Sequence, residues 1–394
     1  MTDRPRLFRP RPPDPSQDDL ARLRLLRSRR VGPATFARLL AEHGSAAEAL
    51  TALPGIARAA GLDDYAPCPE GVALAEARAA GRLGARPLWK GGALYPPALA
   101  EIEDAPPLLW ALGDAALFSR PLVAVAGARN ASALGLRFVR RLAGELSEAG
   151  FVVVSGLARG IDAAAHEAAL PGGTIAVQAG GVDVIYPAEN ADLAQRIAAS
   201  GLRLSDMPMG MPPRARHFPA RNRIISGLSR AVVIVEAAAK SGSLITARCA
   251  AEQGREVLAV PGHPFDARSA GANMLLRDGA TLVRSAADVI EALGGAQPAL
   301  PLPPVRRAEA IRLDGPPLPP RADAAAAPSP SPLAAEAALH GAILDRLGAA
   351  PVMEDHLLEA LAQPLDRIAP ILAEMELSGE ILRQPGGMLC RGAG

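Results

Sequence analysis

Three turns of this sequence combine glycine with arginine, lysine or serine, and such turns are suited to binding phosphate. They span residues 127–132, 155–160 and 240–243, and each one comes after an apolar run of strand length. Glycine lets backbone N–H groups approach an anion, and the N-terminus of a following helix adds a positive partial charge. The predicted phosphate-binding residues in these turns are Gly127, Arg129, Ser132, Ser155, Gly156, Arg159, Gly160, Lys240, Ser241, Gly242 and Ser243.

A run of arginines without acidic neighbours is the second candidate binding feature. Between Asp206 and Glu236 the sequence has no acidic residue, but arginines occur at positions 214, 216, 221, 223 and 230. A solvated surface normally mixes the two signs of charge, so this segment predicts a surface that binds an anion. An aromatic residue in the run could either stack on a base or fill the core. The predicted contacts from this segment are Phe218, Arg221, Asn222 and Arg223.

The motifs of common nucleotide enzymes are missing from the sequence. The first turn reads G-A-R-N-A-S instead of G-x-G-x-x-G, and no G-x-x-x-x-G-K-[ST] loop occurs. Asp162 and His166 lie four residues apart, where we expect them to pair and to order the preceding loop. Cys68, Cys249 and Cys390 are too few and too dispersed for a disulfide framework or a metal site, so we expect buried thiols. The sequence therefore predicts no catalytic residue, no metal and no cofactor.

The elements that must position these turns form an α/β fold. The apolar runs LVAVAG, FVVVSG, TIAVQAG, AVVIVEA and EVLAVPG alternate with helical stretches between residues 121 and 293. This alternation predicts an extended Rossmann-like, mostly parallel sheet covered by helices on both faces. Residues 87–118 are rich in proline and contain both tryptophans, so we expect an extended connector packed on the sheet. Ligands bind at the carboxyl ends of such strands, where the glycine-rich turns occur.

Smaller units flank the predicted sheet. Turn signals at 31–33 and 53–56 separate short helical patterns near the N-terminus, whereas three helical patterns and a hairpin near the C-terminus are typical of a winged helix. The predicted boundaries are 1–17 for a disordered Arg/Pro-rich head, 18–86 for a helical SAM-like or helix-hairpin-helix-like domain, 87–293 for the sheet domain, 294–334 for a Pro/Ala-rich linker and 335–394 for the winged-helix domain.

Charge is unevenly distributed along the 394 residues, although their formal net charge is only +1. Residues 1–40 hold ten arginines and four aspartates, whereas residues 335–394 hold nine acidic residues and four arginines. The acidic C-terminal domain is unsuited to binding nucleic acid through charge, so we expect a protein contact, a regulatory role or a structural role for it. No uninterrupted apolar stretch of 18 residues and no signal peptide is found, so we expect a cytoplasmic protein without a membrane partner.

The ordered motifs of residues 127–262 resemble those of the DNA-processing protein A family, also called Smf. The sequence departs from the family pattern at VAGAR, where the family has VGTR, and at Ser205-Asp206, where the family has Ser-Glu. The matching segments are GAR-x-x-S (127–132), SGLARGID-x-x-AH (155–166), FPARNRIISGLS (218–229), IVEA (234–237), SGSLITA (241–247) and VPG (260–262).

The resemblance implies a cytoplasmic protein that binds single-stranded DNA and protects incoming DNA during natural transformation. It also implies delivery of that DNA to the RecA recombinase, a homodimer, and no catalytic turnover. By the same resemblance, the DNA pocket contains Arg129, Ser155, Gly156, Arg159, Gly160, Arg221, Arg223, Ser241 and Ser243.

A nucleotide-handling Rossmann-like enzyme, similar to phosphoribohydrolases, is the alternative function. Such an enzyme needs an acidic residue at the pocket for general acid/base chemistry, and Glu236 and Asp162 are the candidates. Neither residue has a second acid or a nucleophile beside it in the sequence, so binding without catalysis is the favoured function.

Overall fold

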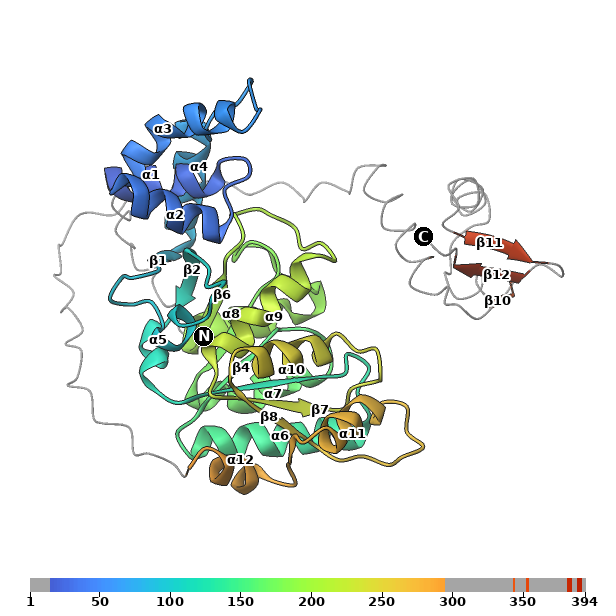
Figure 1. Cartoon of the computed structure of the whole chain (residues 1–394). Helices are drawn as coiled ribbons and strands as arrows, with labels where there is room; N and C mark the ends of the chain where they lie inside the picture. Colours follow the sequence, from blue (N-terminus) through green and yellow to red (C-terminus); the bar gives the residue numbers. More distant parts are fainter. Residues whose placement is uncertain (1–14, 295–342, 344–351, 354–380, 385–387, 392–394) are drawn as a thin grey trace, which may run out of the picture. The chain divides into compact units, whose positions relative to one another are not determined.

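The chain divides into two compact units, Met1–Val305 and Arg306–Gly394. The predicted linker beyond Gly294, the helices of the predicted winged-helix domain and most of the predicted head lie outside the described residues. The computed structural model describes residues 15–294, 343, 352–353, 381–384 and 388–391 (Figure 1).

Four helices form the N-terminal part of the first unit. Serines at positions 16 and 45 cap α1 and α3 by accepting backbone N–H groups of the first turn. Pro33, the last residue of the turn predicted at 31–33, begins α2. The turn predicted at 53–56 is wrong, because α3 continues through Pro54. Leu50, Leu53 and Ala57 are buried along one side of α3, and their burial outweighs the helix-breaking tendency of proline. The helices are α1 (Gln17–Arg27), α2 (Pro33–His43), α3 (Ala46–Ala59) and α4 (Glu70–Leu83).

A nine-stranded sheet forms the centre of the first unit, in the order β1-β2-β6-β5-β4-β3-β7-β8-β9. The seven neighbouring strands β6, β5, β4, β3, β7, β8 and β9 pair in parallel. The β1–β2 and β2–β6 pairs are antiparallel. The strands are β1 (Arg86–Trp89), β2 (Leu108–Gly113), β3 (Leu122–Gly127), β4 (Val152–Ser155), β5 (Thr174–Val177), β6 (Leu202–Ser205), β7 (Ala231–Val235), β8 (Glu256–Ala259) and β9 (Thr281–Leu282).

The five apolar runs of the sequence correspond to β3, β4, β5, β7 and β8, so the mostly parallel sheet is confirmed. The expectation of an extended connector at 87–118 is incomplete. That segment supplies most of β1 and all of β2, and both join the sheet through antiparallel pairing. Strands β6 and β9 have no counterpart among the predicted runs.

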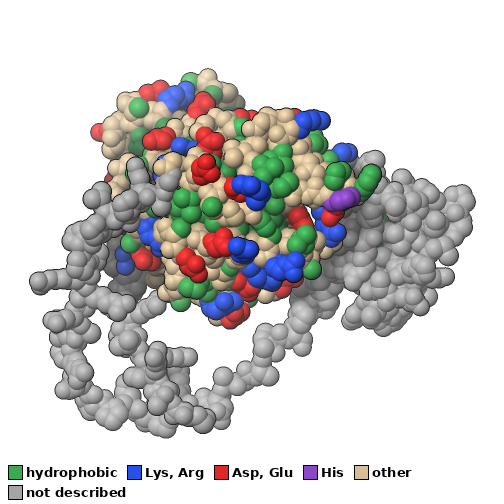
Figure 2. Space-filling model, turned by 90° about the horizontal axis from the view of Figure 1, so that it is seen from below, with side chains coloured by type: hydrophobic (Ala, Val, Ile, Leu, Met, Phe, Trp, Pro, Cys, Tyr) green, Lys and Arg blue, Asp and Glu red, His purple; other side chains and the backbone are tan. Residues whose placement is uncertain are grey.

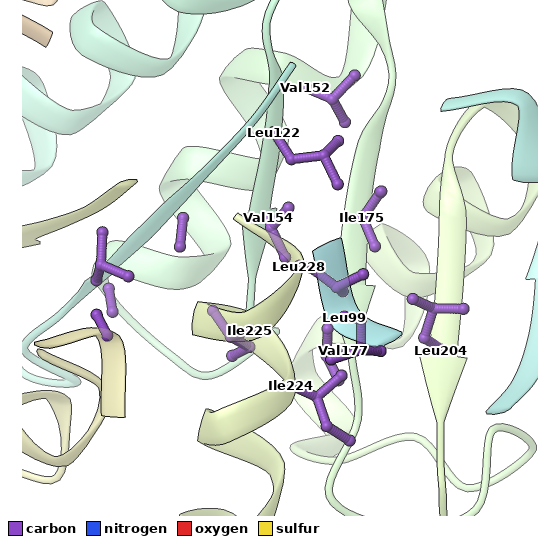
Figure 3. Close-up of a cluster of buried hydrophobic side chains, with 14 of the residues drawn as sticks. Leu99, Leu122, Val152, Val154, Ile175, Val177, Leu204, Ile224, Ile225 and Leu228 are labelled. Carbon is purple, nitrogen blue, oxygen red and sulfur yellow. The ribbon is translucent and has the colours of Figure 1, made fainter. Parts of the chain in front are cut away.

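Helices cover both faces of the sheet. The alternating residues of β3 divide between two clusters, with Val123 and Val125 on one face and Leu122 and Ala124 on the other. The first face packs on α6, α7 and α12, and the second packs on α5, α9, α10 and α11, as in the cluster of Figure 3. The helices are α5 (Pro97–Ala100), α6 (Ala133–Glu148), α7 (Ile161–Ala169), α8 (Ala191–Ser200), α9 (His217–Leu228), α10 (Ser243–Glu252), α11 (Ala270–Arg277) and α12 (Ala286–Ala292).

The second unit contains a three-stranded antiparallel sheet, in the order β10-β12-β11. Its strands are β10 (Val352–Met353), β11 (Ile381–Gln384) and β12 (Met388–Arg391). Strands β11 and β12 pair in antiparallel register, which confirms the hairpin predicted near the C-terminus.

A buried carboxylate joins the helical part of the first unit to its sheet. Glu76 of α4 accepts hydrogen bonds of 2.9 and 2.8 Å from the Arg27 guanidinium of α1. The indole N–H of Trp110 on β2 donates to Glu76 Oε1 at 2.9 Å. The side chain of Glu76 is only 7% exposed, so water cannot replace these partners.

Replacing Glu76 by alanine should destabilise the protein by about 3–5 kcal/mol, because it leaves the half-buried guanidinium of Arg27 without its partner. The free energy of unfolding in urea measures this loss. Glu70→Ala is the matched control, since Glu70 pairs with Arg24 at 3.4 Å while 62% exposed. It should cost about 0–1 kcal/mol. Equal losses in the two variants would contradict the role of Glu76.

Candidate nucleic-acid interface

The turn between β3 and α6 differs from the predicted phosphate-binding turn. Gly127 is required by close packing, since a Cβ there would lie 1.9 Å from the carbonyl oxygen of Val235. Ser132 is the N-cap of α6, and its Oγ accepts the N–H of Gly135 at 2.9 Å. Its own N–H and Oγ–H donate to the carboxylate of Glu236. The N-terminus of α6 is therefore occupied by a carboxylate of the protein itself.

Glu236 holds this position in a left-handed backbone conformation, with φ of 53°. This conformation is strained for a residue with a side chain, and it turns the chain directly after β7. A carboxylate at a helix N-terminus is stabilised by the helix dipole. The same interaction fixes the end of the loop that carries Arg129, which is exposed.

A second carboxylate organises the loop after β4. Asp162 Oδ2 accepts the backbone N–H groups of Gly156 at 3.2 Å and Ala158 at 3.4 Å. Burial raises the pKa of Asp162, while the charge of Arg221 and these backbone N–H groups oppose the rise. The predicted ordering of this loop by Asp162 is confirmed. The predicted pairing with His166 is wrong, because the Nδ1 atom of that ring lies 2.8 Å from Thr174 Oγ1 instead.

Arg221 is buried, with only 4% of its surface exposed. Its Nη1 donates to the carbonyl oxygens of Gly156, at 2.6 Å, and Val177, at the ends of β4 and β5. A Cβ on Gly156 would lie 2.2 Å from Nη1, so this glycine makes room for a guanidinium. Burial lowers the pKa of Arg221 to about 10, and Asp162 opposes this shift. In contrast to the sequence prediction, Arg221 faces inward and fixes α9 against the strand ends.

Three further predicted contacts also bond to protein groups. Arg223 Nη2 lies 3.2 Å from Asp206 Oδ2, and the Arg223 side chain is only 14% exposed. Asn222 Nδ2 donates to the carbonyl of Gly242 at 3.3 Å. Ser155 is fully buried and donates to the Val125 carbonyl at 2.6 Å. These side chains position the loops and offer little to an external ligand.

Four side chains form the outward-facing part of the site, and we call them the rim cluster: Arg129, Arg159, Tyr186 and Phe218. The Arg129 guanidinium carbon lies 5.1 Å from the centroid of the Phe218 ring. Tyr186 packs edge-on against the same ring at 5.8 Å and is 51% exposed. Arg159 is 59% exposed and lies 3.6 Å from Glu189. The small pocket that they surround is also lined by Gly156, Ala158 and Pro187.

Sequence reasoning missed Tyr186 and Pro187, which follow β5 in an irregular segment that also contains Gly180, Gly181 and Asp183. Gly160, with φ of 76°, approaches the carbonyl oxygen of Ala128, and this contact brings the β4 loop beside the β3 loop. The predicted residues that meet at the pocket are thus Arg129, Gly156, Arg159 and Phe218.

The turn at 240–243 follows β7, so it begins at the same edge of the sheet as the loops after β3 and β4. Lys240 and Gly242 are exposed there. Ser241 and Ser243 bond to each other through their hydroxyls at 2.7 Å. This turn therefore offers one cation and polar backbone groups at the same edge of the sheet as the rim cluster.

Charges of both signs are mixed on the face of the molecule that is seen from below (Figure 2). Figure 2 shows the molecule from below, where Lys and Arg side chains alternate with Asp and Glu. Such a mixed surface has no extended field of one sign.

The described residues include no cluster of three or more potential metal ligands and no helix long and apolar enough to cross a membrane. Cys68 is buried as predicted, whereas Cys249 is only half-buried. The side chain of Cys390 lies outside the described part of the structure.

His166 should make the stability of the protein depend on pH. Burial, with a smaller effect of Arg221, lowers the pKa of His166 to about 3, whereas the unfolded chain binds that proton near 6.5. Protons therefore favour the unfolded state between these values. Below about pH 6, the free energy of unfolding should fall by about 1.4 kcal/mol per pH unit relative to that of His166→Asn.

Urea unfolding of both proteins between pH 7 and 5 measures this difference. The raised pKa of Asp162 acts in the opposite direction, but it acts in both proteins and cancels in the comparison. Parallel pH profiles of the two proteins would contradict a buried neutral imidazole.

The sequence matches three family descriptions in chain order. Residues 16–79 match the DprA-like N-terminal HHH domain, residues 87–294 match DNA recombination-mediator protein A, and residues 325–387 match the DprA winged helix domain. The last match agrees with the predicted winged-helix domain, and β10, β11 and β12 form a small sheet in this part of the chain.

Relatives from several bacteria show the same likeness. Protein Smf of Escherichia coli K12 is 38% identical over 296 residues, which are 74% of each chain. The DNA processing protein DprA of Bacillus subtilis 168 is 47% identical over 202 residues, covering 50% of this chain and 68% of the relative. The X-ray structure of DNA processing protein A from Streptococcus pneumoniae is 38% identical with a TM-score of 0.52, covering 61% and 92% of the two chains. The chain therefore belongs to the DNA recombination-mediator protein A family.

Proposed function

We propose that this chain binds single-stranded DNA at the rim cluster. The observation that carries the proposal is the packing of the Arg129 guanidinium on the Phe218 ring, with Tyr186 beside it. A planar guanidinium suits a phosphate, and an aromatic ring such as the exposed Tyr186 can stack on an unpaired base. The bases of a duplex are already stacked on one another, so this arrangement favours an unpaired strand.

Binding at the rim cluster should be independent of base sequence. Contacts to phosphate carry no sequence information, and stacking tolerates every base because each has a π-face. A protein that handles incoming DNA of any sequence needs this tolerance.

We infer that the bound strand is protected and then transferred to the RecA recombinase during natural transformation, in the cytoplasm and by a homodimer. Membership of the recombination-mediator family supports this role. In an assembly assay, RecA should form filaments faster on DNA that carries this protein, and light scattering should give the mass of two chains. The mass of a single chain would contradict the homodimer, and an unchanged rate of filament formation would contradict the transfer of DNA to RecA.

We also infer that the bound strand is not chemically altered. The two acids that an enzyme could use, Glu236 and Asp162, accept backbone N–H groups of Ser132, Gly156 and Ala158. Their carboxylates thus hold loops, which argues against the alternative nucleotide-handling enzyme. Incubation with mononucleotides should release neither base nor phosphate. Reproducible turnover that is lost in Glu236→Gln would contradict binding without catalysis.

Arg129→Ala should weaken binding to single strands of any sequence and reduce the salt dependence of affinity. Each lost phosphate contact lowers the slope of log K against log salt by about 0.7. Fluorescence anisotropy with an oligonucleotide at several salt concentrations measures both effects.

Arg141→Ala is the matched control, because Arg141 is 77% exposed on α6 and pairs with Glu145. It should bind like the wild type. If Arg129→Ala kept the affinity and slope of the wild type, the rim cluster would not be the binding site.

A further inference from the structure

An exposed aromatic ring lies in the loop after β8, outside the rim cluster. Phe265 is 94% exposed, more than any other large apolar side chain in the described part of the chain. The ring of His263 lies beside it, with 5.6 Å between centroids and an angle of 42° between the rings. Single exposed apolar residues are common, so its meaning depends on how the loop is held and where it lies.

The loop that carries Phe265 is attached to α11 at its start and has further hydrogen bonds within it. Asn273 of α11 accepts the N–H of Gly262 at 3.1 Å and donates to the carbonyl of Gly262 at 3.0 Å. On the other side, Asp266 accepts from the backbone N–H of Arg268 at 2.9 Å and from its guanidinium at 3.1 Å. A ring presented by such a loop loses little conformational entropy when a ligand packs on it.

The same loop begins at the sheet edge that carries the proposed DNA site. Strand β8 pairs in parallel with β7, and β7 pairs in parallel with β3. Ala259 is opposite Ile234 on β7, whose next residue, Val235, is opposite Gly127 on β3. With strands about 4.8 Å apart, the end of β8 lies roughly 10 Å from the end of β3.

Charged side chains lie along this edge. Arg268 pairs with Asp266 in the loop after β8, with 3.1 Å between Nε and Oδ1, and Glu236 follows directly after β7. Glu236 in turn bonds to Ser132, three residues after Arg129. The turn with Lys240 and two serines follows β7, the strand between β8 and β3. A polar, partly basic strip therefore separates two aromatic positions.

We propose that Phe265 is a second base-stacking position, which binds a nucleobase of the same DNA strand that the rim cluster holds. The inference rests on the proposed function. The strand would contact Phe218 and Tyr186 with one base, pass its phosphates over the 240–243 turn, and stack another base on Phe265. The ring needs no rearrangement to be reached, because it is already exposed.

Stacking and phosphate contacts have different signatures, which makes the proposal testable. Affinity for an oligothymidine of about 20 nucleotides should fall about 5- to 150-fold in Phe265→Ala. The slope of log K against log salt should stay that of the wild type, since no cation is removed. Phe265→Trp should retain the affinity, because the larger ring also stacks.

A base-free oligomer of deoxyribose phosphate gives the decisive comparison. Wild type and Phe265→Ala should bind this oligomer equally, because it offers nothing to stack. Val72→Ala is the matched control, as Val72 is a 56% exposed apolar residue of α4. It should bind oligothymidine like the wild type.

The outcomes separate this inference from the proposed function. If the wild type fails to bind oligothymidine, the proposed function itself is wrong. If the wild type binds and Phe265→Ala binds equally well, only the second stacking position is wrong. The second stacking position is also wrong if Phe265→Ala changes the oligomeric mass instead of the affinity. It is wrong as well if Phe265→Ala binds the base-free oligomer more weakly than the wild type does.

Discussion

The buried guanidinium of Arg221 is the interaction on which the geometry of the site depends. It bonds to carbonyl oxygens at the ends of β4 and β5, and Asp162, which holds the β4 loop, balances its charge. Phe218 lies three residues earlier on the same helix, so the anchoring of Arg221 also places the aromatic ring of the rim cluster. An unpaired buried charge is costly, so separating α9 from these strand ends would destabilise the protein.

The arginines of the site therefore divide into two groups, one that holds the fold and one that is accessible to a ligand. Arg221 and Arg223 face protein carbonyls and carboxylates and hold α9 in place. Arg129 and Arg159 face outward, where a phosphate can reach them. Glu236 supports Arg129, since its carboxylate occupies the N-terminus of α6 and fixes the loop that carries this arginine. The positive charge available to a ligand is thus smaller than the number of arginines suggests.

Sequence patterns predict this fold better than they predict its site. Strands β3, β4, β5, β7 and β8 are recognisable because each is a near-continuous apolar run. Strand β2 is an apolar run as well, but the prolines around it favour an extended connector, and the apolar run of β6 is interrupted by Arg203. The inward direction of Arg221 has a signal in the helical spacing, since Ile224, Ile225 and Leu228 are buried at the third, fourth and seventh positions after it. The charge run hides this pattern when its arginines are taken together. Tyr186 leaves no signal, because the irregular segment after β5 is positioned only by the folded chain.

Hydrogen exchange of the backbone, with and without saturating oligothymidine, tests most directly whether DNA binds at the carboxyl edge of the parallel strands. Bound DNA should slow exchange in the loops at 128–132 and 156–160, around Tyr186, and at the start of α9. Exchange in α1 to α4 should be unchanged. Protection confined to those four helices or to β10–β12, with the loops at the strand ends unaffected, would contradict the account.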